Sequence, residues 1–409
     1  MFDEKLVIMK NQPHCQALIL KVASRCNLNC SYCYMYNLGD VTYKFQPASM
    51  AESVVEAILI KVRNHCKKHS LKYFDFIFHG GEPLLLKKNF YEDFVERAKA
   101  VLLPVVTPFF SLQTNGTLLT TQWCQLFTRL NIRLGISLDG TAEINDKFRV
   151  DHQGRGSYEK VLQGLKIAQK ASKNSAEPGV LCVIDVNADP LIVYNHLRSL
   201  SINSIGFLLP YGTHDQLPVG LSREQPRTLY ADWLITIFEQ WLIEKSRPRI
   251  RIFEQVFELI LGIDRGFEYL GGKKNEFLVI ETDGSIEAAG ALKVCGNGFT
   301  KAGMNILLHE LDEALQTDLI KLYYSSHFKL CKKCKQCPIA KICGGGFLPH
   351  RFSKKRDFNN PSLFCLDLMR LITHIQNKLL TMLPKDLIAQ SGLSPLNYGQ
   401  LHSYAKEEI

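Results

Sequence analysis

Three cysteines near the amino end, Cys26, Cys30 and Cys33, are spaced as CxxxCxxC. Thiolates are soft ligands that suit iron-sulfur clusters, and three of them would leave one iron of a four-iron cluster without a protein ligand. That iron would be open to another molecule. A structural zinc ion is the alternative, but it requires four protein ligands, and no fourth Cys or His lies within this short segment.

A second group of cysteines lies toward the carboxyl end. Cys331, Cys334 and Cys337 are separated by two residues each, Cys343 follows after five more, and Cys365 after a further 21. Cys334, Cys337, Cys343 and Cys365 could bind zinc as a four-thiolate ribbon or could hold an iron-sulfur cluster. The spacing alone leaves both alternatives open.

The chain has 409 residues, 13 cysteines, and 49 basic against 40 acidic side chains. It has no apolar run long enough to span a membrane, and its first residues lack the features of a signal peptide. We therefore expect a cytoplasmic protein with no membrane association and no structural disulfides. Cys15, Cys66, Cys124 and Cys182 fall in apolar patterns, and we interpret them as core residues.

Short apolar runs alternate with helical patterns between residues 16 and 210. The predicted strands are residues 18–22, 73–78, 109–112, 132–137, 180–184 and 205–208. The clearest helical pattern covers residues 51–62, and Ser49 with Glu52 predicts a capping box at its start. This alternation predicts parallel βαβ units. Six units are fewer than the eight of a closed barrel, so we predict an α/β fold with an open, partial (β/α)6 barrel.

Polar and glycine residues follow the first four predicted strands, at residues 24–26, 79–83, 113–116 and 138–140. Because the carboxyl ends of parallel strands meet at one edge of a sheet, we expect these segments to share that edge with the first cysteine group.

The rest of the chain predicts a helical bridge and a smaller α+β domain. We expect helices at residues 225–244, 253–263 and 366–383. Asp283-Gly284 predicts the turn of a hairpin between residues 277–281 and 285–288. The predicted boundaries are residues 1–215 for the partial barrel, 216–275 for the bridge, 276–372 for the cysteine-rich domain and 373–409 for the terminal helix and tail.

Cys26, Cys30 and Cys33 with Tyr32, followed by Gly80-Gly81-Glu82-Pro83, resemble the radical S-adenosylmethionine (SAM) enzymes. The resemblance implies a [4Fe-4S] cluster on the three cysteines, with SAM bound to the open iron, and an external electron donor of the flavodoxin or ferredoxin type. It also implies SAM contacts from further residues: Gly80, Gly81 and Glu82 at the amino group, Ser137 at the ribose, Arg149 at the carboxylate and Tyr32 at the adenine.

The second cysteine group resembles a SPASM domain, the auxiliary-cluster module of radical SAM enzymes that modify peptides. The resemblance implies that Cys334, Cys337, Cys343 and Cys365 hold an auxiliary [4Fe-4S] cluster. Phe347 occupies the position of a further motif cysteine, a ligand of the other auxiliary cluster in that family. For that possible second cluster, Cys295 and Cys331 are the ligands that remain.

A more specific resemblance covers most of the chain from Cys15 to about residue 372. The segments that carry it are residues 137–140, 143–146, 151–158, 180–185, 207–215, 280–286 and 343–352. They are similar to peptide maturases that install three-residue cyclophanes in ribosomally made peptides. This similarity implies an oxidoreductase that joins an aromatic ring carbon to the β-carbon of a nearby residue in a precursor peptide with a leader.

The sequence does not identify the proton acceptor. We expect the hairpin carboxylates Glu281, Asp283 and Glu287 to be solvated, and His79 could be a packed imidazole. Only 14 residues precede Cys15, so we expect the leader to be recognised by the barrel, the bridge or a separate protein.

Two other functions compete with crosslinking. One is the activity of anaerobic sulfatase maturases, which oxidise a Cys or Ser to formylglycine. The other is nucleic-acid binding by a basic zinc-ribbon protein, but the chain lacks the stripe of Lys and Arg with interleaved aromatic residues that such binding favours. We therefore expect no nucleic-acid partner.

Overall fold

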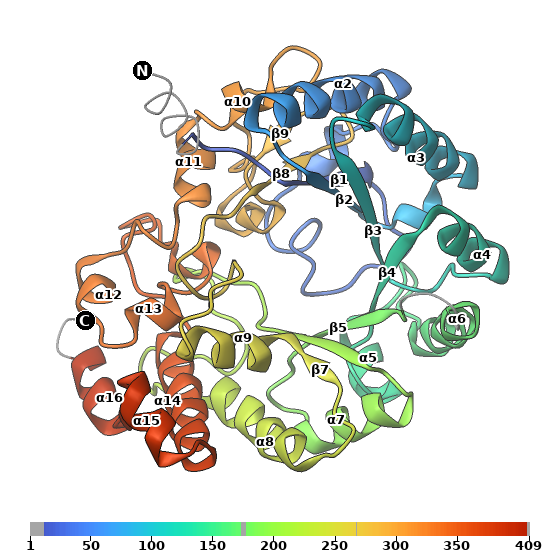
Figure 1. Ribbon diagram of the computed structural model, residues 1–409. Helices are drawn as coiled ribbons and strands as arrows, with labels where there is room; N and C mark the ends of the chain where they lie inside the picture. The colour runs from blue at the N-terminus through green and yellow to red at the C-terminus, as the bar shows by residue number, and fades with distance from the viewer. Residues whose placement is uncertain (1–11, 173–176, 267, 407–409) are drawn as a thin grey trace, which may run out of the picture. The chain divides into compact units, whose positions relative to one another are not determined.

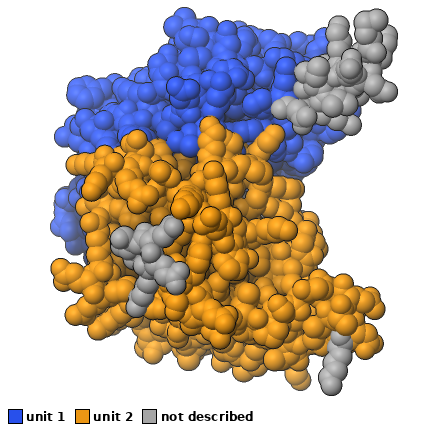
Figure 2. Space-filling model, turned by 90° about the vertical axis from the view of Figure 1, so that its left-hand side faces the viewer, with its two compact units in different colours: residues 1–138, 145–179, 276–324 blue, residues 139–144, 180–275, 325–409 orange. Residues whose placement is uncertain are grey.

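The computed structural model describes residues 12–172, 177–266 and 268–406. The first eleven residues, on which the expected absence of a signal peptide depends, lie outside these ranges. The chain forms two compact units, coloured separately in Figure 2. Unit 1 contains residues 1–138, 145–179 and 276–324, and unit 2 contains residues 139–144, 180–275 and 325–409.

Unit 1 is built on a mostly parallel sheet. Its strands are β1 (Ala17–Ala23), β2 (Tyr73–Gly80), β3 (Thr107–Thr114), β4 (Ile132–Ser137), β8 (Phe277–Ile280) and β9 (Ile286–Glu287). β1 to β4 pair in chain order and in parallel, as predicted. The predicted hairpin forms from β8 and β9, but β8 also pairs in parallel with β1 and so extends this sheet.

The main helices of unit 1 lie along one side of these strands (Figure 1). They are α2 (Glu52–His69), α3 (Lys88–Leu102), α4 (Thr121–Leu130) and α6 (Tyr158–Ala171). Their apolar faces cover the buried side chains of the sheet, among them the stacked rings of Phe78 and Phe110. Shorter elements are η1 (Thr42–Phe45), η2 (Pro83–Leu85), η3 (Gly290–Cys295), α10 (Leu311–Ala314) and α11 (Asp318–Tyr324), and α5 (Ala142–Phe148) spans the boundary between the units.

The predicted capping box at the start of α2 is wrong. The N-cap is Ala51, and no side chain caps the helix. The segment before α2 runs beside β1 instead, because Ser49 forms a β-bridge with Ala23 and the Met50 N–H donates to the Val22 carbonyl at 2.9 Å. This pairing holds Ser49 in an extended conformation and delays the start of the helix.

Unit 2 contains three parallel strands: β5 (Gly179–Val183), of which only Gly179 belongs to unit 1, β6 (Ser204–Leu208) and β7 (Arg249–Ile250). The strand β7 was not predicted. Its longer helices are α7 (Pro190–Ser199), α8 (Leu229–Ile243), α9 (Arg251–Ile260) and α14 (Cys365–Met382). The remaining elements are α12 (Lys332–Gln336), α13 (Ala340–Cys343), η4 (Leu348–Arg351), α15 (Lys385–Ser391) and α16 (Tyr398–Lys406). Among the described residues, no helix is both long enough and apolar enough to cross a membrane.

Candidate active site and cysteine clusters

Cys26, Cys30 and Cys33 lie on the loop that directly follows β1, and all three are partly exposed and form no disulfide. Two N–H donors face the sulfur of Cys26: the backbone of Leu28 at 3.4 Å and the amide of Asn115 at 3.8 Å. Burial, and next the Glu82 carboxyl, raise the pKa of Cys26 to about 12. Thiolates in this loop therefore need compensating positive charge, which bound iron supplies. The donor set fits an iron-sulfur cluster.

Gly80 and Gly81 let the loop after β2 approach the loop of the cysteines. A Cβ on Gly80 would lie 2.2 Å from the carbonyl oxygen of Ala23, and a Cβ on Gly81 would lie 2.2 Å from that of Arg25. The same backbones are joined by hydrogen bonds, from Gly81 N–H to Ala23 at 2.8 Å and from Glu82 N–H to Arg25 at 2.9 Å. The absence of side chains at these two glycines therefore lets the loop after β2 pack directly against the start of the cysteine loop.

Glu82 is fully buried and uses both carboxyl oxygens as acceptors. Oε1 accepts hydrogen bonds from the Leu84 N–H at 2.9 Å and the Thr114 hydroxyl at 2.7 Å, and Oε2 accepts one from the Asn115 N–H at 2.8 Å. Burial raises the pKa of Glu82, although these donors and Arg149 oppose the rise. Glu82 thus braces the end of β3 against the loop after β2. Its predicted contact with the SAM amino group stays a prediction.

The structure brings together two of the other predicted SAM-binding residues. The buried Arg149 guanidinium donates a hydrogen bond of 2.9 Å to the Tyr32 hydroxyl, which lies within the cysteine motif. Ser137 ends β4, where its hydroxyl accepts a hydrogen bond of 2.9 Å from the side-chain amide of Gln113. The roles of these residues toward SAM stay predictions.

In unit 2, Cys334, Cys337, Cys343 and Cys365 all line one pocket. Four convergent thiols give this pocket the donor set of a four-thiolate cluster. Cys331 is the N-cap residue of α12, the helix that contains Cys334. Phe347 does not supply a ligand; its ring stacks on Tyr269, with centroids 4.3 Å apart and planes 12° apart.

The two cysteines predicted for a second auxiliary cluster belong to different units. Cys295 ends η3 in unit 1, Cys331 belongs to unit 2, and both are buried. A second auxiliary cluster on these two cysteines stays a prediction.

Lys21 is a buried basic residue that was not among the predicted site residues. Its ammonium lies 2.6 Å from the Tyr34 hydroxyl and 3.2 Å from Nδ1 of His79, and only 1% of the residue is exposed. Burial lowers the pKa of Lys21 to about 8 and, together with Lys21, lowers that of His79 to about 3. The signal was available, because Lys21 is the single charge in the apolar strand ALILKVA.

The expectation that the hairpin carboxylates are solvated is wrong for two of them. Glu281 and Glu287 are 2% and 1% exposed. Both pair with the ammonium of Lys293, at 3.3 Å and 3.2 Å, and Asp40 lies 3.9 Å from the same group. Parallel pairing of β8 with β1 draws the hairpin into the sheet and buries these groups. They give unit 1 a buried network of acids and bases.

Comparisons with known proteins agree with this geometry. Residues 20–189 match the family model described as the Radical SAM superfamily. The cysteine-type anaerobic sulfatase-maturating enzyme of Clostridium novyi (strain NT) is 27% identical over 360 residues, which cover 85% of this chain and 91% of that enzyme.

Two solved structures share the fold. Native anSMEcpe with bound AdoMet and Cp18Cys peptide superposes with a TM-score of 0.77 and 24% identity, over 90% of this chain and 98% of that one. Streptococcus suis SuiB bound to precursor peptide SuiA gives a TM-score of 0.59 and 16% identity, over 88% and 78% of the two chains. At these identities the likeness shows the fold alone. The match of residues 20–189 to the Radical SAM superfamily, the relatives that span most of the chain and the cysteine loop after β1 together identify an enzyme that uses SAM radical chemistry.

Proposed function

We propose that this enzyme crosslinks a ribosomally made precursor peptide, joining an aromatic ring carbon to the β-carbon of a nearby residue. Cys26, Cys30 and Cys33 would hold the SAM-binding [4Fe-4S] cluster. When SAM and this cluster are bound and reduced by an external flavodoxin or ferredoxin, they supply a 5′-deoxyadenosyl radical. Arg149 and Tyr32, joined at 2.9 Å, would hold the SAM carboxylate and adenine, and Glu82 would brace the loops around them.

The proposed reaction removes two hydrogens from the peptide. A hydrogen atom leaves the substrate Cβ and becomes part of 5′-deoxyadenosine. The carbon radical then forms a bond to the ring, and the ring regains aromaticity by losing one proton and one electron. The proton needs a base and the electron needs a one-electron acceptor.

The convergence of Cys334, Cys337, Cys343 and Cys365 on one pocket is the observation that carries the oxidative part of the proposal, the removal of the second electron. An auxiliary [4Fe-4S] cluster bound there is the acceptor class that the reaction requires. The crosslink itself is favoured by the sequence segments that resemble cyclophane maturases, among them residues 343–352, which form the buried turn around η4. SuiB, with a similar fold, has been solved bound to a precursor peptide.

Formylglycine formation is the second candidate. It is favoured by the similarity to sulfatase-maturating enzymes over 85% of this chain. This reaction also ends in the loss of a proton and an electron, so the cysteine pocket supports it equally. The two candidates differ in the product.

The experiment is anaerobic incubation of the reconstituted enzyme with SAM, a reductant and two kinds of peptide. One is a precursor peptide encoded beside the gene, and the other is a sulfatase-type peptide with a Cys or Ser target. A crosslink appears as the loss of two hydrogens, with no fragment ions between the linked residues and no reaction with a hydrazine. A product that reacts with the hydrazine supports formylglycine formation and overturns crosslinking.

Matched cysteine variants control for the radical step. Cys26→Ala should abolish the formation of 5′-deoxyadenosine, whereas Cys66→Ala removes a buried thiol on α2 and should retain it. Formation of 5′-deoxyadenosine by the Cys26→Ala variant would remove the basis of the proposal.

A further inference from the structure

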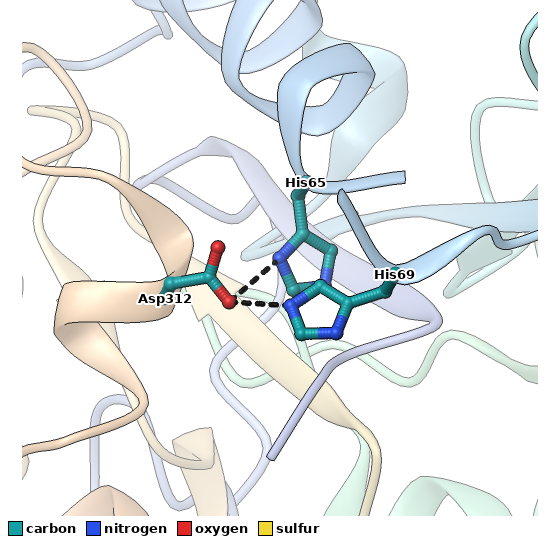
Figure 3. A group of neighbouring side chains, drawn as sticks. All are labelled: His65, His69 and Asp312. Carbon is teal, nitrogen blue, oxygen red and sulfur yellow. Dashed lines mark hydrogen bonds and ion pairs between the residues drawn. The ribbon is translucent and has the colours of Figure 1, made fainter. Parts of the chain in front are cut away.

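Unit 1 contains a second group of metal-ligating side chains, outside the SAM site. His65 and His69 project from the last turns of α2 toward Asp312, which lies in α10 (Figure 3). One ligand atom from each of the three residues lies within 4.8 Å of the other two. Residues four apart on a helix share a face, so α2 presents two imidazoles to one point.

The distances between the ligand atoms of these three residues are short enough for one metal ion to contact all of them after a small adjustment. Nδ1 of His65 lies 3.4 Å from Oδ1 of Asp312, and Nε2 of His69 lies 2.6 Å from the same oxygen. Zinc bonds of about 2.0–2.2 Å in tetrahedral geometry place ligand atoms roughly 3.3 Å apart. The His65 separation already matches this value. A small rotation of the Asp312 carboxylate, which is partly exposed, would open the His69 separation to it.

His65 has the environment of a metal ligand. It is 2% exposed, and its Nδ1 makes no hydrogen bond within the described residues, although it faces the Asp312 carboxylate. Its other ring nitrogen, Nε2, lies 3.2 Å from both the backbone oxygen and the backbone nitrogen of Cys15. Metal-bound histidines commonly donate their second N–H to a backbone carbonyl, which leaves the facing nitrogen unprotonated. When Nε2 accepts from the Cys15 N–H, the ring proton sits on Nδ1 and faces Asp312. A bound ion requires the other tautomer, in which Nε2 donates to the Cys15 carbonyl and Nδ1 is unprotonated.

Lys68 is a cation already next to this cluster. Its ammonium pairs with Oδ2 of Asp312 at 3.3 Å, which leaves Oδ1 to the two histidines.

We propose that His65, His69 and Asp312 form a binding site for a divalent transition-metal ion of the zinc class. Two imidazoles and one carboxylate are borderline and hard ligands that suit Zn²⁺, whereas the thiolate groups of this chain suit iron-sulfur clusters. The three protein ligands leave the fourth position to water. The ion would fasten α10 to α2, and binding would stabilise unit 1 by mass action.

The test uses the full chain with its iron-sulfur clusters loaded, so that cysteines do not capture zinc. The protein is incubated anaerobically with ZnSO₄ and desalted, and zinc and iron are measured in the same sample. We expect about one more zinc per chain in the wild type than in Asp312→Asn or His69→Asn. Glu276→Gln removes a carboxylate near the neighbouring His14 and should retain the zinc. Equal iron in all samples shows that each variant is folded.

Two further measurements separate a metal site from a hydrogen-bonded cluster. Asp312→His supplies a third imidazole and should retain zinc, although it removes the carboxylate that the hydrogen bonds require. Zinc should raise the melting temperature of the wild type and of Asp312→His, and leave that of Asp312→Asn unchanged. No zinc in the wild type, equal zinc in Asp312→Asn, or loss of zinc from Asp312→His would each overturn the proposal.

Discussion

The backbone N–H of Asn115 donates a hydrogen bond of 2.8 Å to Oε2 of Glu82. This bond joins the end of β3 to the loop after β2, and the Asn115 side chain in turn points its amide toward the sulfur of Cys26 at 3.8 Å. Glu82 therefore acts on the cysteine loop through Asn115 as well as through its own backbone. The contact gives the carboxylate a positioning role before any cofactor is bound.

Replacement of Glu82 by Gln should weaken this brace. One carboxyl oxygen becomes an NH₂ group, which faces an N–H or O–H donor in a fully buried position. Leaving a buried donor unpaired costs about 1–3 kcal/mol. We expect a lower melting temperature and weaker SAM binding, measured by anaerobic thermal denaturation and by isothermal calorimetry. Thr114→Val removes a hydroxyl that donates to Oε1 of Glu82 and accepts from the Gly116 N–H, so it should also lower the melting temperature. An unchanged melting temperature for Glu82→Gln would show that the Glu82 hydrogen bonds do not stabilise these loops.

The strands and the loops after them were predictable because their signals are local. Apolar runs give β1 to β4, and glycine and polar residues mark where each strand ends. The cysteine spacing likewise identified both thiol groups, including the four that line the pocket of unit 2.

Long-range pairing was not predictable in the same way. The residues of β8 read as one arm of a hairpin, and only the folded chain shows that this arm pairs with β1, about 260 residues earlier. That pairing buries Glu281 and Glu287, which local sequence favours as solvated groups. The capping box at Ser49 failed for the same reason, because pairing with Ala23 overrides the local preference. His65, His69 and Asp312 meet only because α10 packs on α2.

Gly81→Ala should displace the backbone at the start of the cysteine loop. The added Cβ would lie 2.2 Å from the Arg25 carbonyl oxygen and 2.0 Å from the Tyr36 hydroxyl, so the backbone itself must shift. Overpacking of this kind typically costs about 1–3 kcal/mol. We expect less iron per chain after reconstitution and a lower melting temperature. Gly272→Ala is the matched control, because its nearest neighbour would lie 3.8 Å away. Equal loss of iron in both variants would mean that the close approach at Gly81 is unimportant.

Cys343→Ala should remove the auxiliary cluster and leave the SAM-binding cluster in place. Cys343 lines the pocket with three other cysteines, and a four-iron cluster is poorly held by the three that remain. We expect the loss of about four irons per chain, with the cleavage of SAM to 5′-deoxyadenosine retained and the crosslinked product lost. Cys124→Ala, which removes a buried thiol on α4, should retain the full iron content. Zinc in place of iron in the wild type would restore the zinc-ribbon alternative.

Glu287 should make stability depend on pH. Burial and the neighbouring Glu281 raise the pKa of Glu287 to about 7, although Lys293 opposes this rise. The folded protein therefore binds the proton more tightly than the unfolded chain does. This tighter proton binding adds to the free energy of unfolding. The contribution is complete below the usual glutamate pKa and is lost as the pH rises through about 7.

Glu287→Gln removes this titration, so its melting temperature should fall less than that of the wild type as the pH rises from about 5 to 8. Glu287→Asp keeps a carboxyl group, so its melting temperature should fall with rising pH as steeply as that of the wild type. The melting temperatures are measured anaerobically with the clusters loaded, and iron is determined at each pH to exclude acid loss of the clusters. A slope for Glu287→Gln equal to that of the wild type would show that Glu287 stays ionised in the fold, with Lys293 outweighing the burial.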